Sequence, residues 1–222
     1  MKIKINACDW LVLMLITLSL LLLGWTFLLL PENLHVPIHW NVIGEIDGWT
    51  NRENFLYFAT FQSVLSLLLG IFYYFSRSLF GNKEPNVSTT RTILAMVILF
   101  FVGIQCLILG NIQLENSIES FRLINIGMGF LFIVIGTVMP NLKVNRWAGI
   151  RIKWTMNDPE IWYQVHRTAG KLWLAGGGLV IFESIFLPKS WIVPIVLGVV
   201  FLLCSISFTQ AWLLARRKRT IK

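Results

Sequence analysis

Long apolar runs alternate with shorter polar segments along the whole chain. A helix needs roughly 20 mostly apolar residues to cross the hydrocarbon core of a bilayer. Six runs come close to or exceed that length: residues 9–30, 55–75, 92–110, 121–139, 168–187 and 191–214. Unpaired backbone polar groups are costly in lipid, so each run is expected to be a helix. The pattern predicts an all-α, polytopic membrane bundle of six transmembrane helices.

The run at 168–187 is the least regular, since Lys171, Glu183 and three consecutive glycines at 176–178 interrupt it. Glycines in spanning helices are typical of close helix packing. Glu183 lies about a turn before Pro188 and is expected near the outer membrane face. Gln62, Gln105 and Asn125, in other runs, are scattered and do not indicate an ion path.

Composition agrees with a membrane protein, because 14% of the residues are charged, against about a quarter in soluble domains. The net charge of +8 is concentrated in the breaks between runs, and basic breaks alternate with acidic ones. Cytoplasmic loops carry the excess of Lys and Arg in membrane proteins. This rule places both termini and the loop at 140–167 in the cytoplasm, and direct nucleic-acid binding is not expected.

The first polar break, residues 31–54, contains two prolines that exclude a continuous helix. Asp47-Gly48 is a strong turn signal, and Gly44 permits a tight return of the chain. We expect a compact extracellular structure, such as a short hairpin, held against the outer membrane face by Trp40 and Trp49.

His35 and His39 in this break suggest a metal site. A pair at this spacing binds metal best on a helix, and Pro37 between them disfavours one. Glu45 and Asp47 are the nearby acids that a site would need. A hydrogen bond from His39 to Asp47 or to the backbone is the favoured interpretation.

The longest polar break, residues 139–171, is rich in Trp, Arg, Lys and Asn. Basic and apolar residues alternate from 146 to 154. In an extended conformation, alternation groups the side chains into two sets: Arg146, Ala148, Ile150, Ile152 and Trp154 on one side, and Trp147, Gly149, Arg151 and Lys153 on the other. The second set suits contact with lipid headgroups or an acidic partner.

A helix start follows. Thr155 with Asp158 resembles a capping box, and Asp158 followed by Pro159 fits the N-cap and first helical position. Beyond it, four residues recur at helical spacing: Trp162, His166, Ala169 and Trp173. The pattern predicts a helix that continues into the run at 168–187.

Two interpretations of this loop remain open. In one, Arg and Lys are snorkelling topology anchors and the tryptophans form an interfacial belt. In the other, the loop is a cytoplasmic platform that docks a protein, because it is much longer than a connector of a few residues. Near an anionic leaflet the same charges bind lipid, at about 1 kcal/mol each.

Common catalytic motifs are absent from the sequence: it has no Walker A loop, dinucleotide fingerprint, H-E-x-x-H or G-x-S-x-G. The three cysteines are far apart and show no metal spacing. We therefore expect a non-enzymatic protein without a cofactor.

Both polar motifs together resemble the SdpI family of bacterial immunity proteins, which are multi-pass membrane proteins. An N-terminal domain often fused to this family is similar to the motif at 37–47: Pro37, His39, Trp40, Asn41, Gly44 and Asp47. The family's own signature resembles Pro140, Asn141, Lys143, Asn145, Arg146, Gly149, Ile150, Arg151, Trp154, Thr155, Trp162, His166, Arg167, Gly170 and Lys171. Lys153 departs from it, because the family more often has proline there.

The resemblance implies an immunity protein of the bacterial cell membrane that gives resistance to a secreted peptide toxin, and that in some members also holds a cytoplasmic transcriptional repressor at the membrane. It divides the chain into residues 1–120 and an SdpI-like region at 121–222. The implied toxin-side residues are His39, Trp40, Asn41, Gly44, Asp47 and Trp49. The implied docking residues are Asn145, Arg146, Gly149, Arg151, Lys153, Trp154, Trp162, His166 and Arg167.

Two other functions stay open at this stage. One is a transporter or envelope-stress protein for a small molecule, lipid or peptide, with Glu183 and Gln105 as the side chains to test. The other is a membrane enzyme that uses His39 and Asp47 outside the cell.

Overall fold

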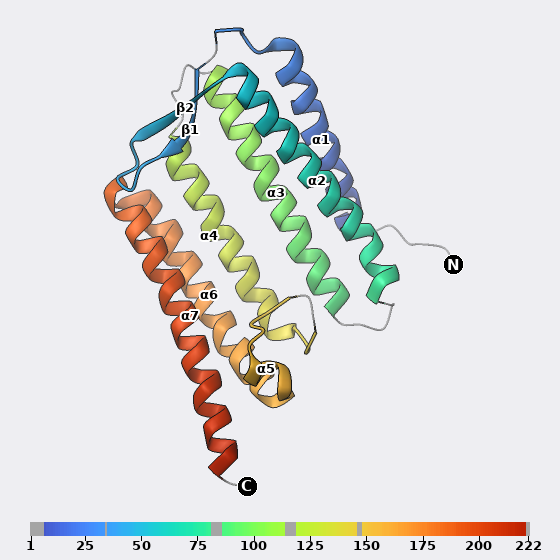
Figure 1. The fold of residues 1–222 in the computed structure, drawn as a ribbon, viewed down its shortest axis with the longest axis vertical. Helices are drawn as coiled ribbons and strands as arrows, with labels where there is room; N and C mark the ends of the chain where they lie inside the picture. Colours follow the sequence, from blue (N-terminus) through green and yellow to red (C-terminus); the bar gives the residue numbers. More distant parts are fainter. Residues whose placement is uncertain (1–6, 34, 81–85, 114–118, 146–147, 221–222) are drawn as a thin grey trace.

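The computed structural model describes residues 7–33, 35–80, 86–113, 119–145 and 148–220. Its long helices are α1 Ala7–Leu29, α2 Arg52–Phe80, α3 Asn86–Gln113, α4 Ser120–Val138, α6 Pro159–Phe186 and α7 Lys189–Thr220. Six helices are long and apolar enough to cross a membrane, judged by length and composition. The predicted all-α polytopic bundle is confirmed (Figure 1).

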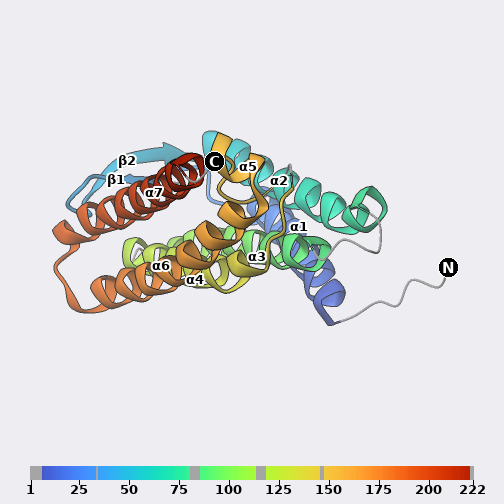
Figure 2. The same ribbon diagram turned by 90° about the horizontal axis from the view of Figure 1, so that it is seen from below.

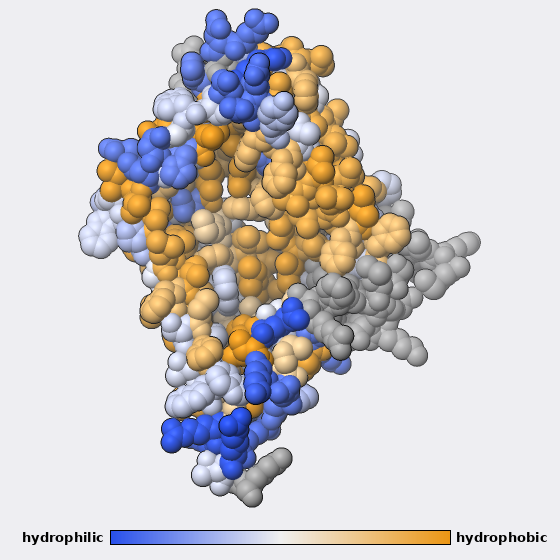
Figure 3. Space-filling view, viewed as in Figure 1, coloured by the Kyte–Doolittle hydropathy of each residue, from blue (hydrophilic) through white to orange (hydrophobic). Residues whose placement is uncertain are grey.

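Successive long helices run in opposite directions, so α1 begins and α7 ends at the same end of the bundle (Figure 1). We call this the loop end, and the opposite end, which carries the strands β1 His35–Trp40 and β2 Ile46–Asn51, the hairpin end. Helices α1, α2 and α3 pack on one another, α6 packs on both α4 and α7, and α3 packs on α4. Figure 3 shows hydrophobic residues between hydrophilic surfaces at the two ends.

Helices α4 and α6 approach closely because glycines face each other along their contact. A Cβ atom added at Gly136 would lie 2.8 Å from the carbonyl oxygen of Gly170, and one at Gly129 would lie 2.9 Å from that of Gly177. The expected close-packing role is confirmed for Gly177, and also for Gly176, whose added Cβ would lie 2.8 Å from Val199.

Glu183 lies near the hairpin end, one turn before α6 finishes, but its side chain is fully buried. Neither carboxylate oxygen has a hydrogen-bond partner among the described residues. The guanidinium of Arg122 on α4 lies at the same helix end, where Nη1 donates to the carbonyl oxygens of Ser184 (2.7 Å) and Leu187 (3.0 Å). Arg122 therefore satisfies the last carbonyls of α6.

Helices α1–α3 contain a buried ion pair that the sequence pattern did not indicate. Arg91 of α3 binds Asp9 of α1, and the hydroxyl of Tyr73 on α2 donates to the same carboxylate at 3.0 Å. The Arg91 guanidinium lies 4.1 Å from the centre of the Tyr73 ring. One acid therefore holds three helices together at their loop ends.

Farther along the same helices, the hydroxyl of Ser19 lies 2.9 Å from Oε1 of Gln105 and 3.1 Å from the hydroxyl of Ser63. Gln62 donates to the backbone carbonyl of Phe101. Gln105 therefore links α3 to α1 and α2, and Gln62 links α2 to α3. Buried Val12, Leu15, Ala95, Ile98 and Val102 belong to the apolar core of this three-helix unit.

Candidate functional sites at the two ends of the bundle

The strands β1 and β2 form the antiparallel hairpin that the sequence predicts. Its turn lies at residues 41–45, where the side-chain oxygen of Asn41 accepts from the backbone amides of Ile43 (3.1 Å) and Glu45 (2.9 Å). Gly44 has φ of +80°, which confirms its expected role in the return.

The predicted turn at Asp47-Gly48 is wrong, because both residues lie within β2. Gly48 pairs with His39 at an irregularity of the ladder, and an added Cβ atom there would lie 2.6 Å from the Cβ of His39. Gly48 therefore allows the two strands to approach closely and does not reverse the chain.

The hairpin contacts both halves of the bundle. On one side, Val36 is buried against α2 and α3, and Arg52, the first residue of α2 after the hairpin, donates to the carbonyl oxygens of Leu30 and Phe27, both at 3.1 Å. On the other side, the Trp40 ring lies 6.4 Å from that of Phe121 on α4. Gly44 lies so close to Phe121 and Lys189 that an added Cβ would come within 2.9 Å of both. The strands thus lie across helices of both halves (Figures 1 and 2).

The motif residues of the hairpin have two kinds of position. Trp40, Asn41 and Gly44 build the turn and attach it to the bundle. His39, Asp47 and Trp49 are exposed, and Nδ1 of His39 lies 2.6 Å from the Asp47 carboxylate. The favoured His39–Asp47 hydrogen bond is thus confirmed. The described residues contain no group of three or more His, Cys, Asp or Glu that could hold a metal ion.

At the loop end, the chain leaves α4 through a short 3-10 turn, η1 Met139–Asn141, and returns through the short helix α5 Lys153–Asn157. Asn145 stabilises the intervening bend: its side chain donates to the carbonyl oxygens of Lys143 (2.8 Å) and Ala148 (3.1 Å) and accepts from the amide of Ala148 (2.8 Å). Arg146, the other predicted residue of this bend, lies outside the described residues.

Gly149 is held against two buried side chains of α6. Its φ is +115°, and an added Cβ atom would clash with Nε2 of His166 and lie 3.0 Å from the Trp162 ring. Both the backbone conformation and the space therefore require glycine.

His166 and Trp162 hold the loop to α6. Nε2 of His166 accepts from the amide of Ile150 at 2.9 Å, so Nδ1, 2.8 Å from the carbonyl oxygen of Trp162, is the nitrogen that carries the proton. The two rings stack with centroids 3.9 Å apart, and the Trp162 indole donates to the carbonyl oxygen of Leu142 at 2.7 Å. Both side chains are fully buried, so neither can contact a docked partner directly.

The predicted extended stretch at 146–154 is shorter than expected. Gly149 interrupts it and α5 begins at Lys153, although Ile150 and Ile152 pack into the core as alternation predicts. Arg151 between them is exposed.

The predicted pairing of Thr155 with Asp158 is wrong. The Thr155 hydroxyl accepts from the amide of Ile152 (3.1 Å) and donates to the carbonyl oxygen of Ile150 (2.6 Å). Asp158 caps α6 as predicted, accepting from the amides of Glu160 (2.9 Å) and Ile161 (3.2 Å).

The loop end projects farther than the ends of the shorter helices. At 1.5 Å per residue, the 28 residues of α6 and 32 of α7 span about 42 and 48 Å, whereas the 19 of α4 span about 29 Å. A hydrocarbon core is about 30 Å thick, so α6 and α7 extend more than 10 Å beyond it. Their projecting ends carry α5, and Figure 3 shows hydrophilic residues there.

Charge is distributed unevenly on this projection. Lys218 of α7 binds both acids at the start of α6, Asp158 and Glu160, each at 2.7 Å. The hydrogen bond from Lys218 lowers the pKa of Asp158. Exposed Arg151, Lys153 and Arg167 give the surface a positive charge, and Trp154 is half-buried against Phe208, with ring centroids 5.2 Å apart.

Six apolar helices, with a polar motif at each end, define a polytopic helical membrane protein. Residues 141–209 match the model of the SdpI/YfhL protein family. The chain therefore carries an SdpI-family domain, and the resemblance seen in the sequence is confirmed for this region. The matched stretch contains all nine predicted docking residues. Comparisons with curated proteins and with solved structures give no significant match.

Proposed function

We propose that this protein is an immunity protein of the bacterial cell membrane, which protects the cell that carries it from a secreted peptide toxin. The observation that supports this most is the SdpI/YfhL family match over residues 141–209. The hairpin is the proposed toxin contact, because it displays His39, Asp47 and Trp49 at the end opposite the basic loop.

The attachment of the hairpin suggests how contact is transmitted. A peptide at Trp49 would press on an element that touches α4 through Phe121 and α7 through Lys189. Both helices continue to the loop end, where Asp158 and Lys218 link α6 to α7.

We further propose that the loop end docks a cytoplasmic repressor through Arg151, Lys153 and Arg167, which are exposed. Gly149, Trp162 and His166 contribute indirectly, by holding the conformation that displays these charges. This role is separable from immunity, since the two surfaces are at opposite ends of the bundle (Figure 1).

Immunity is tested by expressing the protein in a host that is killed by the candidate producer's secreted peptides. Survival should rise with the native chain and fall with a Trp49→Ala/Asp47→Asn variant at equal membrane abundance. Trp10→Ala is the matched control, because Trp10 is also an exposed tryptophan but lies on α1. The proposal fails if the native chain protects against none of these peptides.

Sidedness is tested with single cysteines introduced at Val42 and Lys153, after replacement of the three native cysteines. Both positions are exposed, one in the hairpin turn and one at the start of α5. An impermeant thiol reagent should label position 42 in whole cells and position 153 only after lysis. Labelling of both from the same compartment would remove the arrangement on which immunity and docking depend.

Docking is tested by co-purification of the repressor with the membrane protein. Arg151→Ala/Lys153→Ala should reduce recovery, whereas Arg219→Ala, an exposed charge at the end of α7, should not. Unchanged recovery with the double variant dismisses this surface.

A further inference from the structure

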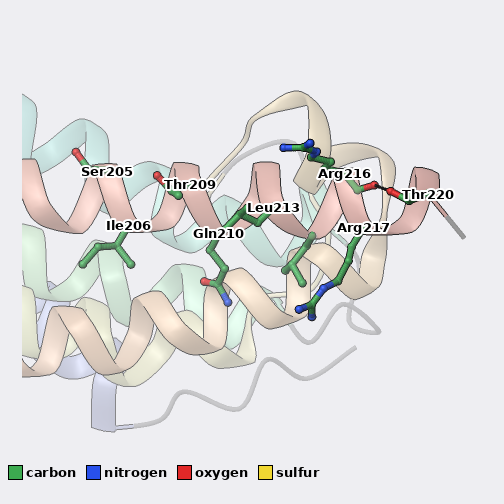
Figure 4. A pocket seen from close by; sticks show the side chains of 9 residues that line it. Ser205, Ile206, Thr209, Gln210, Leu213, Arg216, Arg217 and Thr220 are labelled. Carbon is green, nitrogen blue, oxygen red and sulfur yellow. Dashed lines mark hydrogen bonds between the residues drawn. The ribbon is translucent and has the colours of Figure 1, made fainter.

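An open surface cavity of about 720 Å³ lies along the last four turns of α7 at the loop end, and all nine of its lining residues belong to that helix (Figure 4). Its lining begins at Ser205 and ends at Thr220. Neither the hairpin nor the motif residues of the loop take part in it, so the proposed immunity function does not involve this cavity.

The chemistry of the lining changes along the helix. Ile206 and Leu213 supply apolar surface, Thr209 and Gln210 supply polar atoms, and two guanidinium groups follow at the end, as Figure 4 shows. From the membrane interior outward, a protein surface contacts first the acyl chains, then the ester region and then the phosphates of the lipids. The lining changes from apolar to polar to cationic in the same order.

Gln210 has an unused acceptor in this region. Its amide nitrogen donates to the hydroxyl of Thr168 on α6 at 3.0 Å, while its Oε1 is buried and has no partner among the described residues. Almost none of this oxygen is exposed, so a ligand in the cavity cannot reach it, and Gln210 serves to join α7 to α6.

Depth along α7 supports the same assignment. The helix begins at Lys189 at the hairpin end, and a hydrocarbon core of about 30 Å takes about 20 residues of helix. Thr209 and Gln210 therefore lie near the edge of the hydrocarbon, and Arg216 and Arg217 about two turns farther, toward the headgroups.

Among the described residues, no acid forms an ion pair with Arg216 or Arg217. Asp158 and Glu160 at the start of α6 are both bound by Lys218. Arg216 lies 5.5 Å from the centre of the Trp212 ring, which orients its guanidinium without neutralising it.

We propose that this cavity binds the headgroup of one anionic phospholipid from the leaflet at the loop end. Arg216 and Arg217 donate to the phosphate, which guanidinium groups bind with fork geometry. Leu213 contacts the upper part of an acyl chain. An anionic phospholipid such as phosphatidylglycerol supplies both the phosphate and the acyl chain.

The test uses the full chain, purified in a neutral detergent and titrated with phosphatidylglycerol or phosphatidylcholine, with bound lipids counted by native mass spectrometry. The native protein should retain one phosphatidylglycerol in preference to phosphatidylcholine. Arg216→Gln/Arg217→Gln should weaken phosphatidylglycerol binding about tenfold or more, since each basic residue near an anionic lipid contributes.

Two further variants distinguish specific binding in the cavity from nonspecific attraction to the basic end of α7. Leu213→Trp fills the cavity without changing charge and should also weaken binding. Arg219→Gln removes a charge from a neighbouring residue that does not line the cavity, and should leave binding within about twofold of the native value. Thermal unfolding of each variant without lipid confirms that it is folded.

Three results would overturn the proposal. Equal binding of the two lipids would remove the anion preference. Equal losses in Arg219→Gln and in Arg216→Gln/Arg217→Gln would show a diffuse basic tail. Binding of soluble glycerol phosphate as tight as that of phosphatidylglycerol would reassign the cavity to a free phosphate. None of these results bears on toxin protection.

Discussion

The hairpin and the loop end use the same residue types, but His166 and Trp162 at the loop end are buried, whereas His39 and Trp49 of the hairpin are exposed. Each motif has a glycine in a left-handed conformation pressed on an aromatic ring of a long helix: Gly44 on Phe121, and Gly149 on Trp162. His39 of the hairpin is exposed, whereas His166 is fully buried and accepts a backbone amide. Residue type and spacing therefore did not reveal which histidine could meet a partner.

The difference follows from how each element is stabilised. The hairpin is held by strand pairing and by contacts at its edge, so much of its surface stays free. The loop has no ladder among its described residues, and its backbone groups are satisfied by side chains instead, including those of Asn145, Thr155 and His166. His166 and Thr155 are buried where they satisfy these groups, because a buried backbone amide without a partner is costly.

The largest expected effect contrasts the two glycines. Gly149→Ala combines positive φ with a clash against His166 and should cost about 3 kcal/mol or more of unfolding free energy. Gly44→Ala should cost less, about 1–2 kcal/mol, because its nearest contact, 2.8 Å from the Phe121 ring, is less severe than the clash of an added Cβ at Gly149 with the fully buried His166. Thermal unfolding in detergent measures both. Equal losses would mean that the loop is no more constrained than the hairpin.

The next largest difference is expected between the stability effects of substituting His166 and His39. His166→Ala leaves the amide of Ile150 without its acceptor and opens a cavity beside Trp162, at a cost of about 2–4 kcal/mol. His39→Ala should change stability by less than about 0.5 kcal/mol, because the residue is exposed. If His39 contacts the toxin, survival falls without loss of folded protein. A stable His166→Ala protein contradicts the assigned role of this side chain.

Substitutions of Asp158 distinguish the contribution of its helix cap to stability from that of its ion pair. Asp158→Ala removes the acceptor for the amides of Glu160 and Ile161 and should cost about 1 kcal/mol. Asp158→Asn keeps an acceptor at the N-cap and loses only the charge that binds Lys218, so its loss should be smaller. Identical melting temperatures for the two variants would show that the cap contributes nothing.

The smallest effect is expected from acid, and it compares the two ends of α7. Hydrogen bonds from Lys189 and Lys218 lower the pKa of Glu119 and Asp158, respectively, below their ordinary values. Because the pKa of each carboxyl is lower in the folded protein than in the unfolded chain, both ion pairs stabilise the fold above about pH 4. This stabilisation is lost as the pH falls through the lowered pKa values. Melting temperature measured from pH 6 down to 3 should fall less in Asp158→Asn than in the native chain. An equal fall in melting temperature in both proteins would show that the Asp158–Lys218 pair does not contribute to stability.

The six spans, the hairpin with its glycine return, and the Asp158 cap could all be predicted from the sequence. Each depends on a local pattern: the length of an apolar run, a break with prolines and glycine, or an acid before a proline at a helix start. The two errors were also local. Asp47-Gly48 and Thr155–Asp158 each fit a motif, but Asn41 fixes the turn at residues 41–45, and the Thr155 hydroxyl accepts from the amide of Ile152 instead of pairing with Asp158.

Only the tertiary structure decided which motif residues are displayed, and where the buried polar groups meet. Asp9 and Arg91, or Ser19 and Gln105, are more than 80 positions apart, and no local pattern encodes their pairing. The apolar runs determine that the helices form, because burial in lipid is a property of each run. The helix faces that contact each other depend on both helices of a pair. The burial of His166 and the exposure of Arg151 depend on these contacts in the same way.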